Sequence, residues 1–210
     1  MLQKYMNCTA LIAFFSGMVL TLCFAVDYFE AISGDLSNFG LTPTPIGMLT
    51  TGSNQVIGTT GRGTNGLDLD YFTFNLPTGF QLVSLTELPG TTVGGTVSCI
   101  GIQAGNQLTV ATNASTANGL LGWTHYDSSY ADVDLLPRFG IASSGSSGFA
   151  PPLPSGAYSV WIQDFNAGTF NYGFHFRVQA VPEPGSVSLL LGAAVSGAEI
   201  VMYRRRRVKA

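Results

Sequence analysis

Hydrophobic and polar residues alternate in several short stretches of this chain, which is typical of half-buried β-strands. In residues 70–76 the alternation would place Phe72 and Phe74 on one face of a strand. A Pro-Thr-Gly turn follows at residues 77–79, so we expect residues 81–86 to return as the partner strand. Further strands are expected at residues 97–102, 107–111, 132–139, 157–163 and 172–178, the last two as a terminal pair. About eight strands at such short spacing predict an all-β fold, built as a single antiparallel β-sandwich.

The N-terminal segment has a different pattern, because a long apolar run replaces the alternation. Lys4 precedes the apolar residues 8–26, and the small residue Ala25 lies near the end of the run. This order predicts a helical secretory signal peptide over residues 1–25, cut after Ala25 or after Ala31. An uncleaved anchor and a core helix of the fold are the alternatives.

The C-terminal segment, residues 181–210, contains three signals in a fixed order. They are the motif Val181, Pro182, Glu183 and Pro184, an apolar stretch at residues 185–203, and a basic cluster at residues 204–209 with Arg204, Arg205, Arg206 and Arg207. As a helix, the apolar stretch would span about 28 Å, near the thickness of a bilayer core. The arginines would then hold its end on the cytoplasmic side. Glu199 lies inside the apolar stretch, where an ionised carboxylate is costly unless it reaches the interface.

The ordered set of these three signals resembles the PEP-CTERM sorting signal of Gram-negative bacteria. The resemblance implies export by the general secretion machinery, transient anchoring in the inner membrane, and recognition by an exosortase, a membrane transpeptidase-like enzyme. In family terms, the four motif residues form the recognition element and the arginine cluster forms the membrane stop. The expected destination is the cell surface or extracellular matrix, with exopolysaccharide as a partner. An ordinary C-terminal membrane anchor is the alternative.

Charged residues make up 10% of the chain, and their distribution is uneven. Residues 26–180 contain ten acidic residues and three arginines, which gives this stretch a net charge of −7. An acidic body does not neutralise phosphates, so no nucleic-acid partner is expected. The chain also contains 26 glycines, a composition that favours short strands joined by turns. We therefore expect residues 26–180 to form one β-rich body.

The residues that could carry catalysis show no catalytic arrangement in the sequence. His125 is expected in a surface loop and His175 in a strand, and no Gly-x-Ser-x-Gly turn accompanies them. The serines at residues 143–148 belong to a flexible loop. Cys99 is the one cysteine of the body and is expected to pack as a small hydrophobic residue. No catalytic residue is predicted, and the chain is not expected to be an enzyme.

Two groups of residues could bind a ligand. Asp68 and Asp70, together with Asp132 and Asp134, could supply oxygen ligands for a calcium ion from two loops. The alternative is that they are solvated carboxylates that keep strand edges from pairing. Trp123 and Tyr126 flank His125 and could stack on sugar rings, although aromatic residues of β-proteins often lie in the core.

The order of short motifs in the body carries a second resemblance. The motifs lie at residues 68–74, 77–79, 132–135 and 153–158. In this order they look like a divergent bacterial pre-peptidase C-terminal domain, over about residues 50–180. That family is a jelly-roll-like β-sandwich appended to secreted enzymes, and the resemblance implies the same architecture here.

The sequence thus predicts three parts: a signal peptide at residues 1–25, a β-sandwich body at residues 26–180, and a sorting tail at residues 181–210. The expected role is that of an exported, non-enzymatic structural protein of the cell surface or extracellular matrix. The rival is a carbohydrate- or protein-binding module, with or without a stabilising calcium ion.

Overall fold

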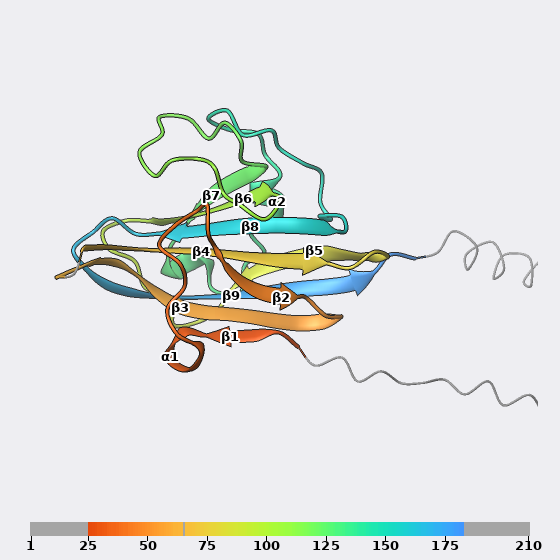
Figure 1. Ribbon diagram of the computed structural model, residues 1–210, viewed down its shortest axis with the longest axis horizontal. Helices are drawn as coiled ribbons and strands as arrows, with labels where there is room; N and C mark the ends of the chain where they lie inside the picture. The colour runs from red at the N-terminus through yellow and green to blue at the C-terminus, as the bar shows by residue number, and fades with distance from the viewer. Residues whose placement is uncertain (1–24, 65, 183–210) are drawn as a thin grey trace, which may run out of the picture.

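The computed structural model describes residues 25–64 and 66–182. Nearly all of the predicted signal peptide lies outside the described residues, as do Glu183, Pro184, the predicted membrane helix at residues 185–203 and the basic cluster. Within the described residues, no helix is long and apolar enough to cross a membrane. The body itself is all-β and mostly antiparallel, with few helices (Figure 1).

Nine strands and three single-turn helices make up the described chain. The strands are β1 (Asp27–Phe29), β2 (Thr44–Met48), β3 (Gly52–Gly63), β4 (Gly66–Leu76), β5 (Phe80–Glu87), β6 (Ser98–Ala104), β7 (Gly122–Tyr126), β8 (Gly156–Gln163) and β9 (Gly168–Ala180). The helices are α1 (Glu30–Ser33), the 3₁₀ helix η1 (Ser128–Tyr130) and α2 (Leu136–Phe139).

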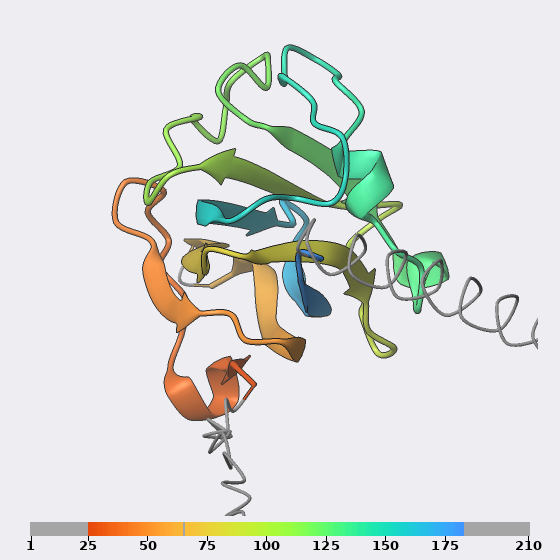
Figure 2. The same cartoon turned by 90° about the vertical axis from the view of Figure 1, so that its right-hand side faces the viewer.

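The strands join in one curled sheet in the order β5-β9-β3-β4-β8-β6-β7, and β1 and β2 pair in parallel with β3 and β4. The β3–β4 hairpin is hydrogen-bonded only near its turn, where residues 61–63 face residues 66–68. In contrast, β3 pairs with β9 along residues 52–61. Because β3 and β4 separate beyond the turn, the two halves of the sheet turn their inner faces toward each other (Figure 2).

Large apolar side chains from both halves fill the space between these inner faces. Phe72 and Phe74 of β4 meet Phe176 of β9, with ring centroids 6.0 and 5.5 Å apart. Tyr71 points the other way and stacks on Trp161 of β8, in a separate apolar cluster on the outer face. The alternation predicted for residues 70–76 is therefore confirmed. Each fully buried aromatic side chain stabilises the fold by about 1.5–3 kcal/mol.

The pairing of the strands differs from the prediction. β4 pairs with β8 along its length and β5 pairs with β9, so residues 81–86 are not the partner of residues 70–76. In the same way, β8 and β9 do not form a pair, because each bonds to strands of its own half. The chain crosses between the halves after β4, after β5 and again after β8. Alternation indicates which face of a strand is buried, but it does not identify the partner strand. Here strands of both halves bury an apolar face, so the pattern could not distinguish them.

The predictions of two strands are wrong, and four strands of the structure were not predicted. Residues 107–111 form irregular structure, and residues 132–139 form turns that end in α2, which contains Pro137. The missed strands are β1, β2, β3 and β7. β3 contains Gly58 and Gly61 inside its pairing region, and glycine weakens the sequence signal of a strand.

The two ends of the described chain lie at the same end of the sheet (Figure 1). Near the N-terminal end, the amide of Val26 donates to Asn54 Oδ1 at 3.1 Å, at the beginning of β3. Near the C-terminal end, Val178 of β9 pairs with Gly52, also at the beginning of β3. Residues 25 and 182 therefore lie on the same side of the body.

Candidate functional site

Four neighbouring strands place a row of aromatic residues on the outer face of one half of the sheet. Tyr71 of β4 lies opposite Trp161 of β8, which lies opposite Gly101 of β6, which in turn lies opposite Trp123 of β7. Gly101 has no side chain, so a gap separates the two indoles. A Cβ at this position would come within 3.2 Å of the side chain of Leu120.

A groove of about 400 Å³ lies at this gap. The next row of the same strands, Gln163, Cys99 and His125, also lines it. Residues of the segment between β6 and β7 form another part of the lining, and Leu120 in this segment packs into the outer apolar cluster. The two tryptophans and the strand residues beside them thus make a partly enclosed surface with both apolar and polar atoms.

Two residues that line the groove each have a buried polar atom without a hydrogen-bond partner. Trp161 is 8% exposed, and its Nε1 donor is unpaired, as is the Oε1 acceptor of Gln163. In contrast, Trp123 Nε1 donates to the carbonyl of Ser143 at 3.3 Å, which fixes this indole. A buried polar atom without a partner costs about 1–3 kcal/mol. Both atoms are inaccessible to solvent, so the polar atoms that a ligand could reach belong to other residues of the lining.

Two titratable groups beside the groove, Cys99 and Asp164, are held in unreactive states. Burial raises the pKa of the Cys99 thiol to about 12, so the thiolate is scarce at neutral pH. Burial also acts to raise the pKa of Asp164, but its hydrogen bonds outweigh this and hold it below the ordinary value. These bonds come from the Ser98 hydroxyl at 2.5 Å and from the amides of Gly94 and Asn166 at 2.7 and 2.8 Å. Asp164 therefore links the segment between β8 and β9 to the residues at the beginning of β6.

The structure separates the two residues predicted to stack on sugars. Trp123 lines the groove, whereas Tyr126 is 1% exposed and packs on Phe174, with ring centroids 5.1 Å apart. Both residues belong to β7, where positions 123 and 126 face opposite sides, so the assignment of Tyr126 to a binding surface is wrong. His125 also lies in this strand and not in a loop, with its ring against Trp123. His175 lies in β9, and its Nε2 has no partner.

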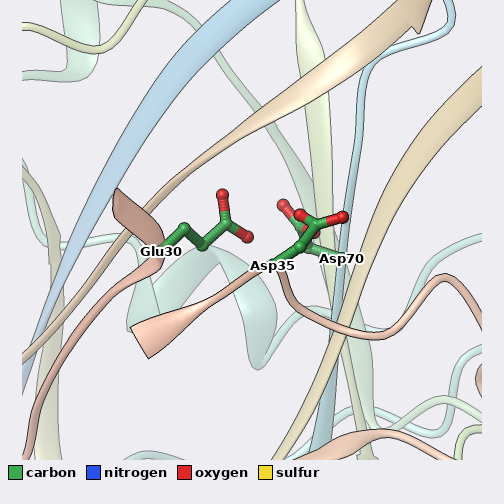
Figure 3. A group of neighbouring side chains, drawn as sticks. All are labelled: Glu30, Asp35 and Asp70. Carbon is green, nitrogen blue, oxygen red and sulfur yellow. The ribbon is translucent and has the colours of Figure 1, made fainter. Parts of the chain in front are cut away.

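A second group of side chains gathers where the N-terminal segment meets β3 and β4. Glu30 of α1, Asp35 and Asp70 of β4 each place a carboxylate oxygen within 4.8 Å of the other two. Figure 3 shows the side chains of Glu30 and Asp35 beside that of Asp70. The three acids come from parts of the sequence that the fold brings together.

Asp70 is the buried member of this acidic cluster. It shares the inner face of β4 with Phe72, is 0% exposed, and accepts no hydrogen bond on either carboxylate oxygen. Burial, followed by the nearby charge of Glu30, raises the pKa of Asp70 to about 10. The buried Tyr172 hydroxyl lies beside Asp70 and acts to lower this pKa, but its geometry is not that of a hydrogen bond. An ionised Asp70 therefore needs a further partner.

Glu30 is held toward the cluster by the backbone. Its two oxygens accept hydrogen bonds from the amide of Thr59 at 2.8 Å and the amide of Leu36 at 3.3 Å. Burial raises its pKa, although both amides act in the opposite direction. Gly58 makes room for the carboxylate, because a Cβ at this position would overlap it. Asp35 is exposed, so the cluster is open to water on that side.

The four carboxylates predicted to bind calcium do not gather in one place. Asp68 precedes Asp70 on the same face of β4, and burial, followed by the charge of Asp35, raises its pKa to about 6. Asp134 instead accepts a hydrogen bond from the amide of Leu136 at 3.0 Å, next to α2. Asp132 is exposed, and its amide is bonded to the edge strand β5. The groups near Asp70 are the acids of the N-terminal segment.

Sequence reasoning missed the contribution of this N-terminal segment. Residues 26–35 contain three of the ten acids of the body, a concentration that could have drawn attention to them. Nothing in their spacing, however, indicates that they would meet β4. Comparison with protein-family models, curated proteins and solved structures found no match.

Proposed function

We propose that this chain is an exported protein of the cell surface or extracellular matrix, delivered through its C-terminal tail. The tail would be recognised by an exosortase through Val181, Pro182, Glu183 and Pro184, with residues 185–203 held in the inner membrane and the arginine cluster as the stop. Export to the membrane would use the N-terminal signal peptide and the general secretion machinery.

The observation that carries this proposal is the position of the two chain ends. Both described ends lie at one end of the sheet, so the predicted signal segment and the predicted tail could occupy one membrane while the body stays on one side of it (Figure 1). The sheet also ends where the motif begins. Val178 is buried, whereas Val181 is 45% exposed. An enzyme could therefore reach the motif without unfolding the body.

The first described residues favour one of the two expected signal cleavage sites. Cleavage after Ala31 would remove β1, which pairs in parallel with β3, and would also remove Glu30. Cleavage after Ala25 would leave both in place. We therefore propose Val26 as the first residue of the mature protein.

For the body we propose a structural, non-enzymatic role and a jelly-roll-like β-sandwich architecture. The two inner faces pack on each other through residues such as Phe72, Phe74 and Phe176, which is the packing of a sandwich. The crossings after β4 and β8 pass from one half to the other, as in jelly rolls.

The sorting proposal can be tested by following the protein in its native cells. A Pro182→Ala, Glu183→Ala double variant should accumulate in the inner-membrane fraction, whereas the unchanged protein should reach the surface and be accessible to added protease. A Thr78→Ala variant, changed at an exposed turn, is the matched control and should reach the surface. Equal surface delivery of the double variant would contradict the proposal.

A second candidate function, saccharide binding, is favoured by the groove between Trp161 and Trp123. Sugars present apolar faces that stack on aromatic rings and hydroxyl groups that pair with unsatisfied polar atoms. The groove offers an aromatic surface, since its indoles flank a gap at Gly101, and the side chains of Gln163 and His125 add polar groups to its lining. Exopolysaccharide of the producing cell is the expected ligand class.

The saccharide proposal predicts that Trp123→Ala weakens binding to purified exopolysaccharide by roughly tenfold or more. Trp161→Phe keeps an aromatic ring but removes the unpaired donor, so it should weaken binding less. Phe39→Ala is the matched control, because Phe39 is an exposed aromatic residue that does not line the groove. Binding that is unchanged by Trp123→Ala in an affinity-gel or titration assay would contradict saccharide recognition here.

A further inference from the structure

We propose that Glu30, Asp35 and Asp70 form a calcium site that fastens the N-terminal segment to β4. The three carboxylates supply one oxygen each within 4.8 Å of one another, and Asp70 is 0% exposed with both oxygens unpaired (Figure 3). This site is separate from the sorting tail and from the groove between Trp161 and Trp123.

Asp70 is buried, and neither of its carboxylate oxygens has a hydrogen-bond partner. Buried carboxylates are normally paired with donors, with cations or with metals. In the described part of the chain the three arginines are Arg62, Arg138 and Arg177, and none forms an ion pair with the cluster. Arg138 instead lies over the ring of Tyr130, 4.4 Å from its centroid. A cation from solution would supply the missing partner.

Tyr172 is a second buried residue beside the cluster whose polar atom has no partner. Its side chain is 2% exposed, and its hydroxyl oxygen is also without a hydrogen-bond partner. This oxygen and the Glu30 carboxylate both border the space left by Gly58. An unpaired neutral oxygen therefore lies beside the carboxylates, at a place where an ion or an ion-bound water could satisfy it.

The ligand types and their exposure favour calcium over other metals. All candidate ligands are oxygens, and calcium takes six to eight of them at about 2.3–2.6 Å in flexible geometry. Asp35 is exposed, so waters can complete the shell on that side. Magnesium requires about 2.0–2.1 Å and near-octahedral order, which carboxylates from three separate segments satisfy less readily.

Calcium would change the attachment of the N-terminal segment. β1 is three residues long and α1 four, and their attachment to the sheet depends on few hydrogen bonds. Two of the three proposed ligands, Glu30 and Asp35, belong to this segment, whereas Asp70 belongs to the sheet. Binding would join the two and displace the proton that Asp70, with its pKa of about 10, carries without the ion.

The test uses the full chain in a non-ionic detergent, stripped with EDTA and titrated with CaCl₂. Calcium should bind at sub-millimolar to millimolar concentration, raise the thermal midpoint by several degrees and protect residues 26–35 from proteolysis. Asp35→Asn should weaken binding by roughly tenfold or more without disturbing the fold, because Asp35 is exposed. Asp132→Asn, at another exposed acid, should bind like the unchanged chain.

Asp70→Asn separates a metal site from a purely structural role. In EDTA this variant should be at least as stable as the unchanged chain, since a buried carboxylate is replaced by a neutral group of the same shape. In calcium it should lose the increase in thermal midpoint. The proposal is overturned if about 10 mM CaCl₂ has no effect, if MgCl₂ acts equally well, or if Asp35→Asn responds as Asp132→Asn does.

Discussion

Glu87 is a buried acid whose protonation should make the free energy of unfolding depend on pH. It lies in β5 opposite Phe174, is 0% exposed, and accepts no hydrogen bond on its carboxylate. Burial, followed by the charge of Asp127, raises its pKa from 4.5 to about 7. The Tyr126 hydroxyl is the other titratable group that interacts with it. The protonated form of Glu87 is therefore favoured in the folded state.

The sign and size of the effect follow from proton linkage. Between pH 4.5 and about 7 the folded protein binds more protons at Glu87 than the unfolded chain, so stability falls as the pH rises through this window. A pKa increase from 4.5 to about 7 corresponds to about 3 kcal/mol. Because β5 is an edge strand and Glu87 has fewer neighbours than a group deep in the core, we expect a loss of about 1–3 kcal/mol.

The measurement compares the chain from Val26 to Pro182 with its Glu87→Gln variant by urea unfolding in EDTA at several pH values. Tryptophan fluorescence follows the unfolding. The variant's free energy of unfolding, relative to the unchanged chain, should rise by about 1–3 kcal/mol between pH 4.5 and 8. The difference between the two proteins cancels the contributions of the acidic cluster. A difference that does not change with pH would refute the assignment of Glu87 to a dry core position.

Three further predictions concern packing, the N-terminal segment and the free thiol. Gly122→Ala should lower the free energy of unfolding in urea by about 2 kcal/mol or more, because the new Cβ would overlap the backbone carbonyl of Phe139. Gly63→Ala should be neutral, because its Cβ would meet open space, and equal effects would contradict the packing of α2 on β7. A chain that begins at Ile32 should unfold at a lower temperature than one that begins at Val26, and equal midpoints in a thermal melt would show that β1 is dispensable. Cys99 should react with a thiol reagent at pH 8 only after unfolding, since burial raises its pKa to about 12; rapid labelling of the folded chain would contradict this.

Local strand signals could be predicted from the sequence, but strand pairing could not. The alternation in residues 70–76 correctly placed Phe72 and Phe74 on one face of the strand, which packs in the main core, while Tyr71 on the other face packs in the outer cluster. The same pattern occurs in both halves of the sheet, so it could not indicate that the chain crosses between them after β4. The glycine-containing strand β3 was missed, since its register depends on pairing with β9.

The candidate sites depend on contacts between distant parts of the chain. Trp123 was predicted as a surface aromatic residue, but Trp161 was assigned no role in binding, and only the strand register brings the two to either side of Gly101. Asp70 was predicted as a ligand, but its nearest acids come from the N-terminal segment, about forty residues earlier in the chain. Neither spacing nor composition encodes such contacts, which depend on the whole topology.

The central claim, delivery and processing through the C-terminal tail, is tested most directly by the intact mass of the protein recovered from the native cell surface. We expect the mass of a chain that begins at Val26 and lacks the residues beyond about Pro184. We also expect that the Pro182→Ala, Glu183→Ala variant keeps the complete C-terminus. A complete C-terminus in both proteins would contradict enzymatic sorting and would identify the tail as a permanent anchor.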